Sequence, residues 1–114
     1  SEGERLFDRH CQQCHSKEPM TLNELRHKKH LFKAPPMNLV IERLKEVITI
    51  SVDDEDAKQA VVTAFMKDYV RAPSIDKGLC RVGCFVQYGV MPAVDASLSD
   101  KELQLISAWS YEHF

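Results

Sequence analysis

The chain has 114 residues, of which 44% are hydrophobic and 28% charged, and its 15 Lys and Arg residues oppose 17 Asp and Glu residues. This is the size and composition of one globular domain, spanning 1–114. The near balance of charge argues against a nucleic-acid binder, and the longest apolar runs, such as 39–41 and 60–62, are too short to span a bilayer.

The first half of the chain predicts two helices separated by a long loop. Glutamates in the first turn and a shared face of Leu6, Phe7 and His10 indicate a helix over 2–13. Residues 16–36 show no sustained period and are expected to form a loop that ends in two prolines. An apolar stripe then predicts a helix over 37–48, followed by a break at 49–52.

The second half predicts two further helices and a short one. Acidic residues at 53–56 precede a helix that runs to about Arg71, and 74–96 is irregular except for a short helix near 79–88. Ser99 and Glu102 fit a capping box for the last helix, which carries Ile106 and Trp109. No useful segment alternates with the period of a strand, so the fold class is all-α with long connections.

Cys11-Gln12-Gln13-Cys14-His15 is a C-x-x-C-H motif, the attachment sequence of c-type haem. On a helix, two thiols three residues apart lie about a turn apart, so each can add to a vinyl group of the same porphyrin. The adjacent His15 can then reach the iron. The motif therefore predicts one covalent haem c held by Cys11, Cys14 and His15.

Two other interpretations use the same cysteines. A C-x-x-C pair can be a thioredoxin-like redox site, but that site needs a βαβ setting, which the sequence does not offer. A Cys₄ zinc site is the stronger alternative. It would combine the C-x₂-C pair with the C-x₃-C pair Cys80 and Cys84.

Further motifs give the chain a family resemblance. They are Gly3-Glu4-Arg5-Leu6-Phe7 before the C-x-x-C-H motif, Pro35-Pro36, and Tyr88-Gly89-Val90-Met91-Pro92-Ala93 followed by Leu98-Ser99-Asp100-Lys101-Glu102-Leu103. With these, covering the first 15 and roughly the last 30 residues, the chain resembles the class I (His/Met) cytochromes c, in particular bacterial monohaem members. His15 and Met91 lie 76 residues apart. This spacing is long for a small bacterial member, so the chain would have a middle segment that is enlarged relative to such proteins.

The resemblance implies a cytochrome c fold, with helices wrapped around one covalently bound haem. His15 would be the proximal ligand and Met91 the distal one. A carbonyl group at Pro35 or Pro36 would accept the other ring N–H of His15. Gly3 would permit a close crossing of the first and last helices, with Leu6 and Phe7 packing against Ile106 and Trp109.

The distal ligand has competitors in the sequence. Gly89 and Pro92 bracket Met91 in a loop, which favours it as a ligand. The other candidates are Met20, Met37 and Met66, or His27 and His30 in a bis-histidine arrangement.

With both axial positions filled, no open site remains for a substrate, so we expect an electron carrier and not an enzyme. The expected protein is periplasmic, lacks a membrane span, binds no nucleic acid and exchanges one electron with donor and acceptor redox proteins, with a monomer favoured. Because the chain starts at Ser1, we expect its signal peptide to have been removed already. The alternatives are a haem c subunit or domain of a periplasmic oxidoreductase complex, and a haem-based sensor with a displaceable Met91.

Outside the motif, the sequence leads to two more predictions, one for the remaining cysteines and one for a cluster of basic residues. Phe85 stands where a second haem motif would need histidine, so we expect Cys80 and Cys84 to form a local disulfide in an oxidising compartment. The basic residues 26–30, with Lys33, are expected either to steer an acidic redox partner or to form a solvated loop.

Overall fold

Helices form all the regular structure in the residues that the computed structural model describes, which are 1–50, 53–80 and 82–114. In chain order the elements are α1 (Glu2–His10), α2 (Leu22–Lys28), the 3₁₀ helix η1 (Lys29–Leu31), α3 (Met37–Val47), α4 (Glu55–Arg71), α5 (Val82–Tyr88) and α6 (Asp100–His113). The all-α prediction is confirmed for these ranges. The radius of gyration is 13.7 Å, close to the roughly 13 Å typical of a single domain of this length.

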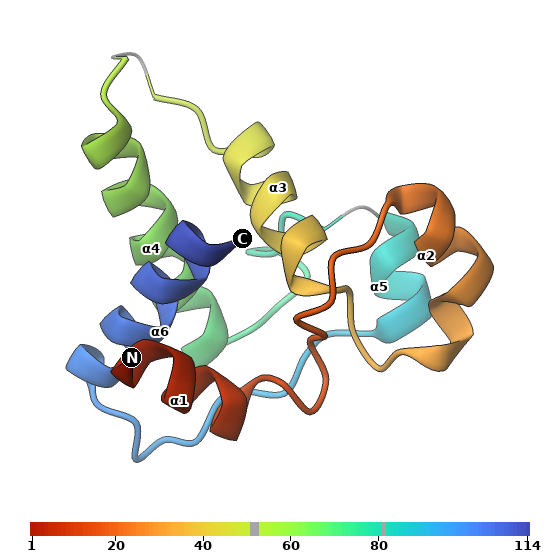
Figure 1. Ribbon diagram of the computed structural model, residues 1–114, viewed down its shortest axis with the longest axis horizontal. Coiled ribbons are helices and arrows are strands. Elements are labelled where there is room, and N and C mark those ends of the chain that lie inside the picture. The colour runs from red at the N-terminus through yellow and green to blue at the C-terminus, as the bar shows by residue number, and fades with distance from the viewer. Residues whose placement is uncertain (51–52, 81) are drawn as a thin grey trace.

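The terminal helices α1 and α6 cross closely, as Figure 1 shows in red and blue. A Cβ atom on Gly3 would lie 2.5 Å from the carbonyl oxygen of Leu105 and 2.7 Å from Cβ of Trp109, so only glycine allows this approach. Phe7 is 1% exposed, and its ring centroid lies 5.3 Å from that of Trp109. The predicted crossing at Gly3 is therefore present.

Helices α3 and α4 complete the core around α6. Their fully buried residues Ile41 and Val62 join Leu103 and Ile106 in one apolar cluster. Polar contacts at the surface fix α4 against α6, because the ammonium group of Lys67 lies 3.1 Å from Asp100 and 3.2 Å from the Gln104 side-chain oxygen.

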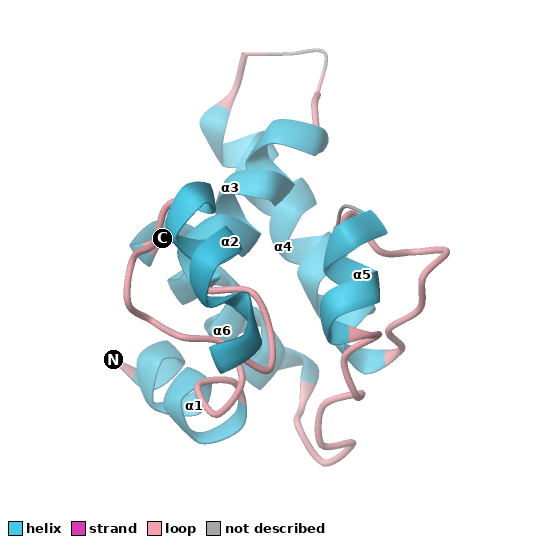
Figure 2. Cartoon of the chain, turned by 90° about the vertical axis from the view of Figure 1, so that its right-hand side faces the viewer, coloured by secondary structure: helices cyan, strands magenta, loops and turns pink. Residues whose placement is uncertain are grey.

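The remaining helices, α2, η1 and α5, lie on the other side of the molecule, at the right of Figure 1 and towards the viewer in Figure 2. Neither α2 nor η1 contains a buried residue. Large apolar side chains are exposed in these helices, namely Leu22 by 44%, Leu31 by 68% and Val86 by 82%. In the segments before and after α5, Ile75 is exposed by 63% and Val90 by 39%.

Two parts of the sequence prediction differ from the structure. The first helix ends at His10 and not at 13, because the backbone turns at Cys11. The loop predicted over 16–36 is wrong in part, since it contains α2 and η1. A capping box formed by Thr21 and Glu24 starts α2 without an apolar stripe.

The other predicted helices are present with small shifts. The helix predicted over 37–48 ends at Val47, and the one predicted after the acidic run begins at Glu55 with Asp54 as its N-cap. The short helix near 79–88 starts at Val82. Residues 51–52 of the predicted break lie outside the described residues.

Candidate haem-binding site

The C-x-x-C-H motif lies in hydrogen-bonded turns directly after α1. The amide of Cys11 donates to Phe7 at 2.8 Å, and the amides of Cys14 and His15 both donate to the carbonyl of Cys11, at 3.2 and 2.9 Å. The motif therefore forms turns that close on the carbonyl group of Cys11 and does not continue α1. The prediction that the motif lies on a helix is wrong. Cys11 and Cys14 are both free and partly buried.

The imidazole of His15 is held by a hydrogen bond to a residue that lies 20 positions later in the chain. Its Nδ1 atom lies 2.8 Å from the carbonyl oxygen of Pro35. Burial lowers the pKa of His15, and the hydrogen bond to Pro35 partly offsets this. A neutral ring that donates from Nδ1 presents the lone pair of Nε2 outward, which is the form that binds a metal.

Backbone contacts explain why Pro35 lies beside His15. The amide of Met37 donates to the carbonyl of Ser16 at 2.9 Å. The side chain of Asn38 bonds both backbone groups of Met20, accepting at 3.2 Å and donating at 2.8 Å. These bonds tie the segment after the motif to the start of α3, immediately after the two prolines. Pro36 is buried. Among the described hydrogen bonds, the one at the ring nitrogen of His15 involves Pro35 and not Pro36.

The thiol of Cys11 has a raised pKa. Burial, together with the neighbouring Cys14, raises the pKa of the Cys11 thiol to about 11. A thiol of this kind is protonated at neutral pH and is a poor nucleophile for disulfide exchange. This argues against a thioredoxin-like redox pair, in which one thiol has a lowered pKa.

Met91 lies partly buried in the irregular segment between α5 and α6. Gly89, at φ +73°, ends α5 with a left-handed residue and turns the chain. The segment is fastened to the end of α4, since the amide of Val94 donates to Val70 at 2.9 Å and Arg71 donates to Leu98 at 3.0 Å.

Asp95 lies in the same segment, and its carboxylate accepts hydrogen bonds from the amide and the hydroxyl group of Ser97, at 2.9 and 2.8 Å. Hydrogen bonds from Ser97 are the main cause of its lowered pKa, and the charges of His10 and Arg9 at the end of α1 add to the effect. These hydrogen bonds fix the local backbone four residues after Met91.

The other methionines and the candidate histidines have different surroundings. Met37 is 5% exposed in the apolar core, and Met66 packs against that core. Both positions favour packing over a role as ligand. His27 and His30 are exposed on α2 and η1, and Nδ1 of His27 lies 2.8 Å from the Asn23 carbonyl oxygen.

Cys80 and Cys84 form a disulfide, with their Cα atoms 5.9 Å apart. Cys80 precedes α5 and Cys84 lies within it, so the bond ties the segment before the helix to its first turns. The bonded sulfurs are not available for a Cys₄ zinc site. Across the described ranges, no three His, Cys, Asp or Glu side chains gather as a metal site would need.

Tyr88 is a further candidate residue, to which the sequence alone assigns no role. Its hydroxyl group is buried and has no hydrogen-bond partner among the described residues, and burial raises its pKa. A buried phenol without a partner is costly, so it indicates a polar acceptor that the polypeptide does not supply. Its position three residues before Met91 is the only sequence signal for this role.

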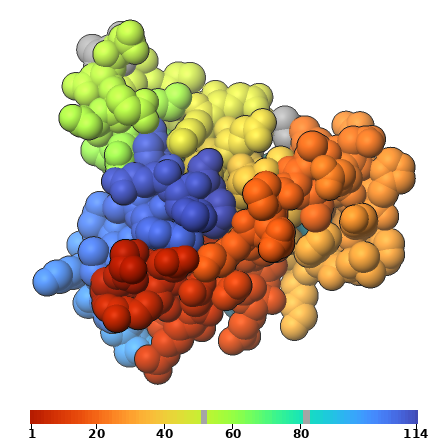
Figure 3. All heavy atoms as spheres, viewed as in Figure 1, coloured from red at the N-terminus to blue at the C-terminus, as the bar shows by residue number. Residues whose placement is uncertain are grey.

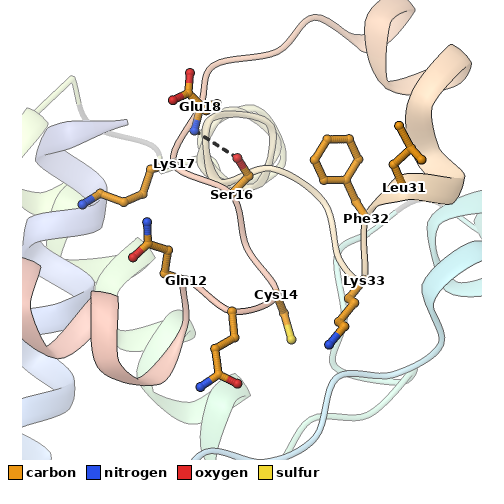
Figure 4. Close-up of a pocket in the computed structure, with 9 residues that line it drawn as sticks. Gln12, Cys14, Ser16, Lys17, Glu18, Leu31, Phe32 and Lys33 are labelled. Atoms are coloured by element: carbon orange, nitrogen blue, oxygen red, sulfur yellow. Dashed lines mark hydrogen bonds between the residues drawn. The ribbon is translucent and has the colours of Figure 1, made fainter.

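A pocket of about 310 Å³ borders the motif on the side of α2 and η1. Figure 4 shows the thiol of Cys14 and the side chain of Lys33 extending towards the same side of this pocket. Leu31 and Phe32 lie across from the motif residues Gln12 and Cys14. The pocket therefore connects the motif with the exposed face of η1.

The donor set fits a covalent haem c. The chain offers two reduced thiols at the spacing that porphyrin attachment uses, and an oriented imidazole on the next residue. A partly buried thioether and an unpartnered phenol lie on the segment from α5 to Met91. We therefore consider Cys11, Cys14, His15 and Met91 as the residues that would hold the group.

Comparison with known proteins adds one similar sequence. An uncharacterized protein of Aquifex aeolicus (strain VF5) is 29% identical over 119 residues, which covers 98% of this chain and 73% of that protein. No family model and no solved structure matches the chain.

None of the helices within the described ranges is both long enough and apolar enough to cross a membrane.

Proposed function

We propose that this chain is a class I cytochrome c: a one-electron carrier with one His/Met-ligated, covalent haem c. The observation that carries the proposal is the 2.8 Å contact between Nδ1 of His15 and the Pro35 carbonyl oxygen, at the end of a C-x-x-C-H motif with two free thiols. This contact fixes the ring and its tautomer, as a ligand to a metal requires.

Cys11 and Cys14 attach the porphyrin in this proposal. Each thiol would hold the porphyrin through one thioether bond, and adding an S–H group across a vinyl group would need no oxidant. The reaction needs reduced thiols, and both cysteines are free. Iron in the bound haem supplies a one-electron couple.

His15 would bind the iron through Nε2, and Met91 would bind it through its sulfur. Thioether sulfur favours ferrous iron and raises the reduction potential relative to two histidines. Two protein ligands leave no coordination position for a substrate, which supports electron transfer and not an enzymatic reaction.

The disulfide supports a periplasmic location. Bonds such as Cys80–Cys84 persist in oxidising compartments and are rare in the bacterial cytosol. In this proposal the partners are redox proteins that donate and accept the electron.

A second candidate function is a haem c subunit of a periplasmic oxidoreductase complex. It is favoured by two large exposed side chains, Ile75 in the segment before α5 and Val86 on α5, which are 63% and 82% exposed. A stable complex would bury such residues. Co-purification with a stoichiometric protein would favour this function over a free carrier.

The optical spectrum of the oxidised and reduced protein, produced with a haem-attachment system, tests the main proposal. We expect haem that stays bound after denaturation, and a weak near-infrared band of the ferric protein from sulfur ligation. Haem that is released by acidic acetone would contradict attachment through Cys11 and Cys14.

Met91→Leu tests the distal ligand. The near-infrared band should disappear while the covalent haem remains, and Met66→Leu should leave the band unchanged. If the band persists in Met91→Leu, another residue is the ligand. If ferrous wild-type protein binds carbon monoxide at neutral pH without denaturation, the displaceable-methionine sensor replaces the carrier as the proposed function.

A further inference from the structure

Helix α5 needs support from outside itself, because its seven residues are too few to form a stable helix alone. None of its side chains described at 83–88 is fully buried. Phe85 makes a packing contact with the segment before the helix, since a Cβ atom on Gly78 would overlap its ring. The disulfide between Cys80 and Cys84 adds a covalent bond to the same segment. These two contacts hold α5 against the residues that precede it.

The segment before the disulfide is fixed to the core. Leu79 packs against the apolar cluster, and its carbonyl oxygen accepts a hydrogen bond from Nε of Arg43 on α3 at 2.9 Å. Cys80 is the next residue, so the disulfide connects this anchor to Cys84 within α5. The two cysteines lie only four positions apart, and so short a loop contributes less to global stability than a long one. The main effect of the bond is therefore local, on the position of α5.

Met91 lies between the disulfide-bonded helix and a second anchor. It follows Cys84 by seven positions, and Gly89, at φ +73°, turns the chain between them. On the other side of Met91, the amide of Val94 donates to the carbonyl of Val70 near the end of α4. If the disulfide opens, the second anchor remains. The first end of the segment that carries Met91 would then depend on noncovalent packing alone.

One side of α5 is open to solvent. In Figure 3 the orange residues, which include α2, lie in front of α5, whereas the side view of Figure 2 shows no other helix in front of it. Val86 is 82% exposed, and Gly83, three positions earlier, is exposed on the same face of the helix. Within the described part of the chain, a Cβ atom built on Gly83 would meet nothing within 4 Å. A protein can therefore approach this face.

The disulfide beside this face defines the chemistry of the partner. A thiolate opens a disulfide by attacking one sulfur, and a dithiol completes the reaction by closing a disulfide of its own. Cys80 and Cys84 are both partly exposed, so a nucleophile can reach the bond. Val86, two residues after Cys84, offers an apolar contact that a small reductant would not use. The face therefore fits a dithiol protein better than a small thiol.

We propose that Cys80–Cys84 is an exchange site for a reduced dithiol protein, and that opening this bond releases Met91 from the haem iron. The inference rests on the proposed function and adds a means of regulating the same site. One thiolate of the partner bonds a sulfur of the pair, and the S–S bond breaks. The second thiol of the partner then bonds the first and frees the chain. Two electrons and two protons pass to Cys80 and Cys84, which end as thiols, while the partner ends as a disulfide.

Carbon monoxide binding to the ferrous holoprotein tests the release of Met91. Ascorbate reduces the iron and leaves the disulfide intact, and in this state we expect almost no binding. After treatment with dithiothreitol, the apparent affinity for carbon monoxide should rise at least roughly tenfold, because it follows the fraction of protein whose methionine is released. The Cys80→Ser, Cys84→Ser double variant should bind carbon monoxide equally with and without dithiothreitol, which controls for direct effects of the reductant.

Two measurements report on the site without using the iron. Mass spectrometry after alkylation detects the opened pair, because Cys11 and Cys14 of the holoprotein would be held in thioether bonds. Once the pair is open, hydrogen exchange at the amides of α5 should be at least roughly tenfold faster, with the amides of α6 unchanged.

Reduced thioredoxin is the protein probe for the partner surface. Val86→Glu should slow the opening of the disulfide by thioredoxin at least roughly threefold and leave its opening by dithiothreitol unchanged. Val61→Glu alters a valine on α4 that is 43% exposed, so it is the matched control and should change neither rate. Equal effects of the two variants, or a bond that dithiothreitol opens and thioredoxin does not, would overturn the protein partner.

The outcomes distinguish this inference from the proposed function. If the open disulfide leaves carbon monoxide binding and α5 exchange unchanged, the release of Met91 is wrong while the electron carrier stands. A disulfide that resists dithiothreitol in the native holoprotein would overturn the exchange site. Carbon monoxide binding with the disulfide intact would overturn both the carrier and the switch. A chain without covalent haem would overturn the proposed function, and with it the control of the iron by Cys80 and Cys84.

Discussion

The two sides of the molecule are held together in different ways. On one side α1, α4 and α6 interlock through Gly3, Phe7 and Val62, which are buried. On the other, α2 and η1 contain no buried residue, and Val86 on α5 is 82% exposed. We call these the α6 side and the α5 side. The polypeptide supplies the core of the α6 side, and Cys11 packs against that core. We infer that the haem of the proposed function would complete the α5 side.

The largest expected effect is the loss of order on the α5 side when the haem cannot attach. In the Cys11→Ser, Cys14→Ser double variant, we expect the amides of α2 and α5 to exchange at least roughly tenfold faster than in the holoprotein. The amides of α6 should change little, because their protection comes from contacts with α1 and α4. Hydrogen exchange followed by mass spectrometry measures both.

Cys80→Ser, Cys84→Ser is the matched control, because it changes two cysteines but leaves the motif intact. It should keep covalent haem and the holoprotein pattern in α2. If the motif variant loses protection equally in α6 and α2, the two sides form a single cooperative unit and the comparison is wrong.

Two glycines give the next largest expected difference between the sides, in the free energy of unfolding. Gly3→Ala places a methyl group 2.5 Å from a backbone carbonyl oxygen at the α1–α6 crossing, so we expect a loss of about 1–3 kcal/mol in the free energy of unfolding. Gly83→Ala adds a methyl group with nothing within 4 Å in α5. It should be neutral or stabilising by up to about 1 kcal/mol. Guanidinium unfolding measures both, and equal losses would contradict the difference in packing.

The two capping boxes give a smaller contrast. Ser99→Ala removes the cap of α6, which is part of the core, and should lower the global free energy of unfolding by about 1 kcal/mol. Thr21→Ala removes the same cap from the exposed α2. Its effect should be on local exchange in α2, with a global change below about 0.5 kcal/mol. A global loss from Thr21→Ala as large as that from Ser99→Ala would show that α2 unfolds together with the core.

The same contrast explains which elements could be predicted from the sequence. Helices that bury one face carry an apolar stripe, as α3 does through Ile41 and Leu44, and their positions were predicted closely. Helix α2 buries nothing and so has no stripe. The local sequence signal for α2 is the Thr21 and Glu24 spacing of a capping box, and the prediction of a loop did not take it into account.

The candidate site was predictable where chemistry depends on local spacing. The C-x-x-C-H motif and the proline segment are visible in the sequence, and the structure places Nδ1 of His15 beside the Pro35 carbonyl. The unpartnered hydroxyl of Tyr88 was not predictable, because it depends on which distant segments cover α5. The haem ligands themselves stay predictions for the spectra to test.

Two buried phenol hydroxyl groups provide the last comparison. That of Tyr88 has no partner among the described residues, whereas that of Tyr111 on the α6 side donates to the carboxylate of Glu55. Burial, with Glu55 adding to it, raises the pKa of Tyr111 to about 12, although the ammonium of Lys45 lies 4.4 Å from the ring centroid. An unfolded tyrosine loses its proton near pH 10, so between about pH 10 and 12 the unfolded state binds fewer protons than the folded state. Stability from Tyr111 is therefore complete below pH 10 and is lost as pH rises towards 12. In guanidinium unfolding, the difference between wild type and Tyr111→Phe should stay constant from pH 7 to 9 and shrink above pH 10. A difference that grows above pH 10 would contradict the hydrogen bond to Glu55.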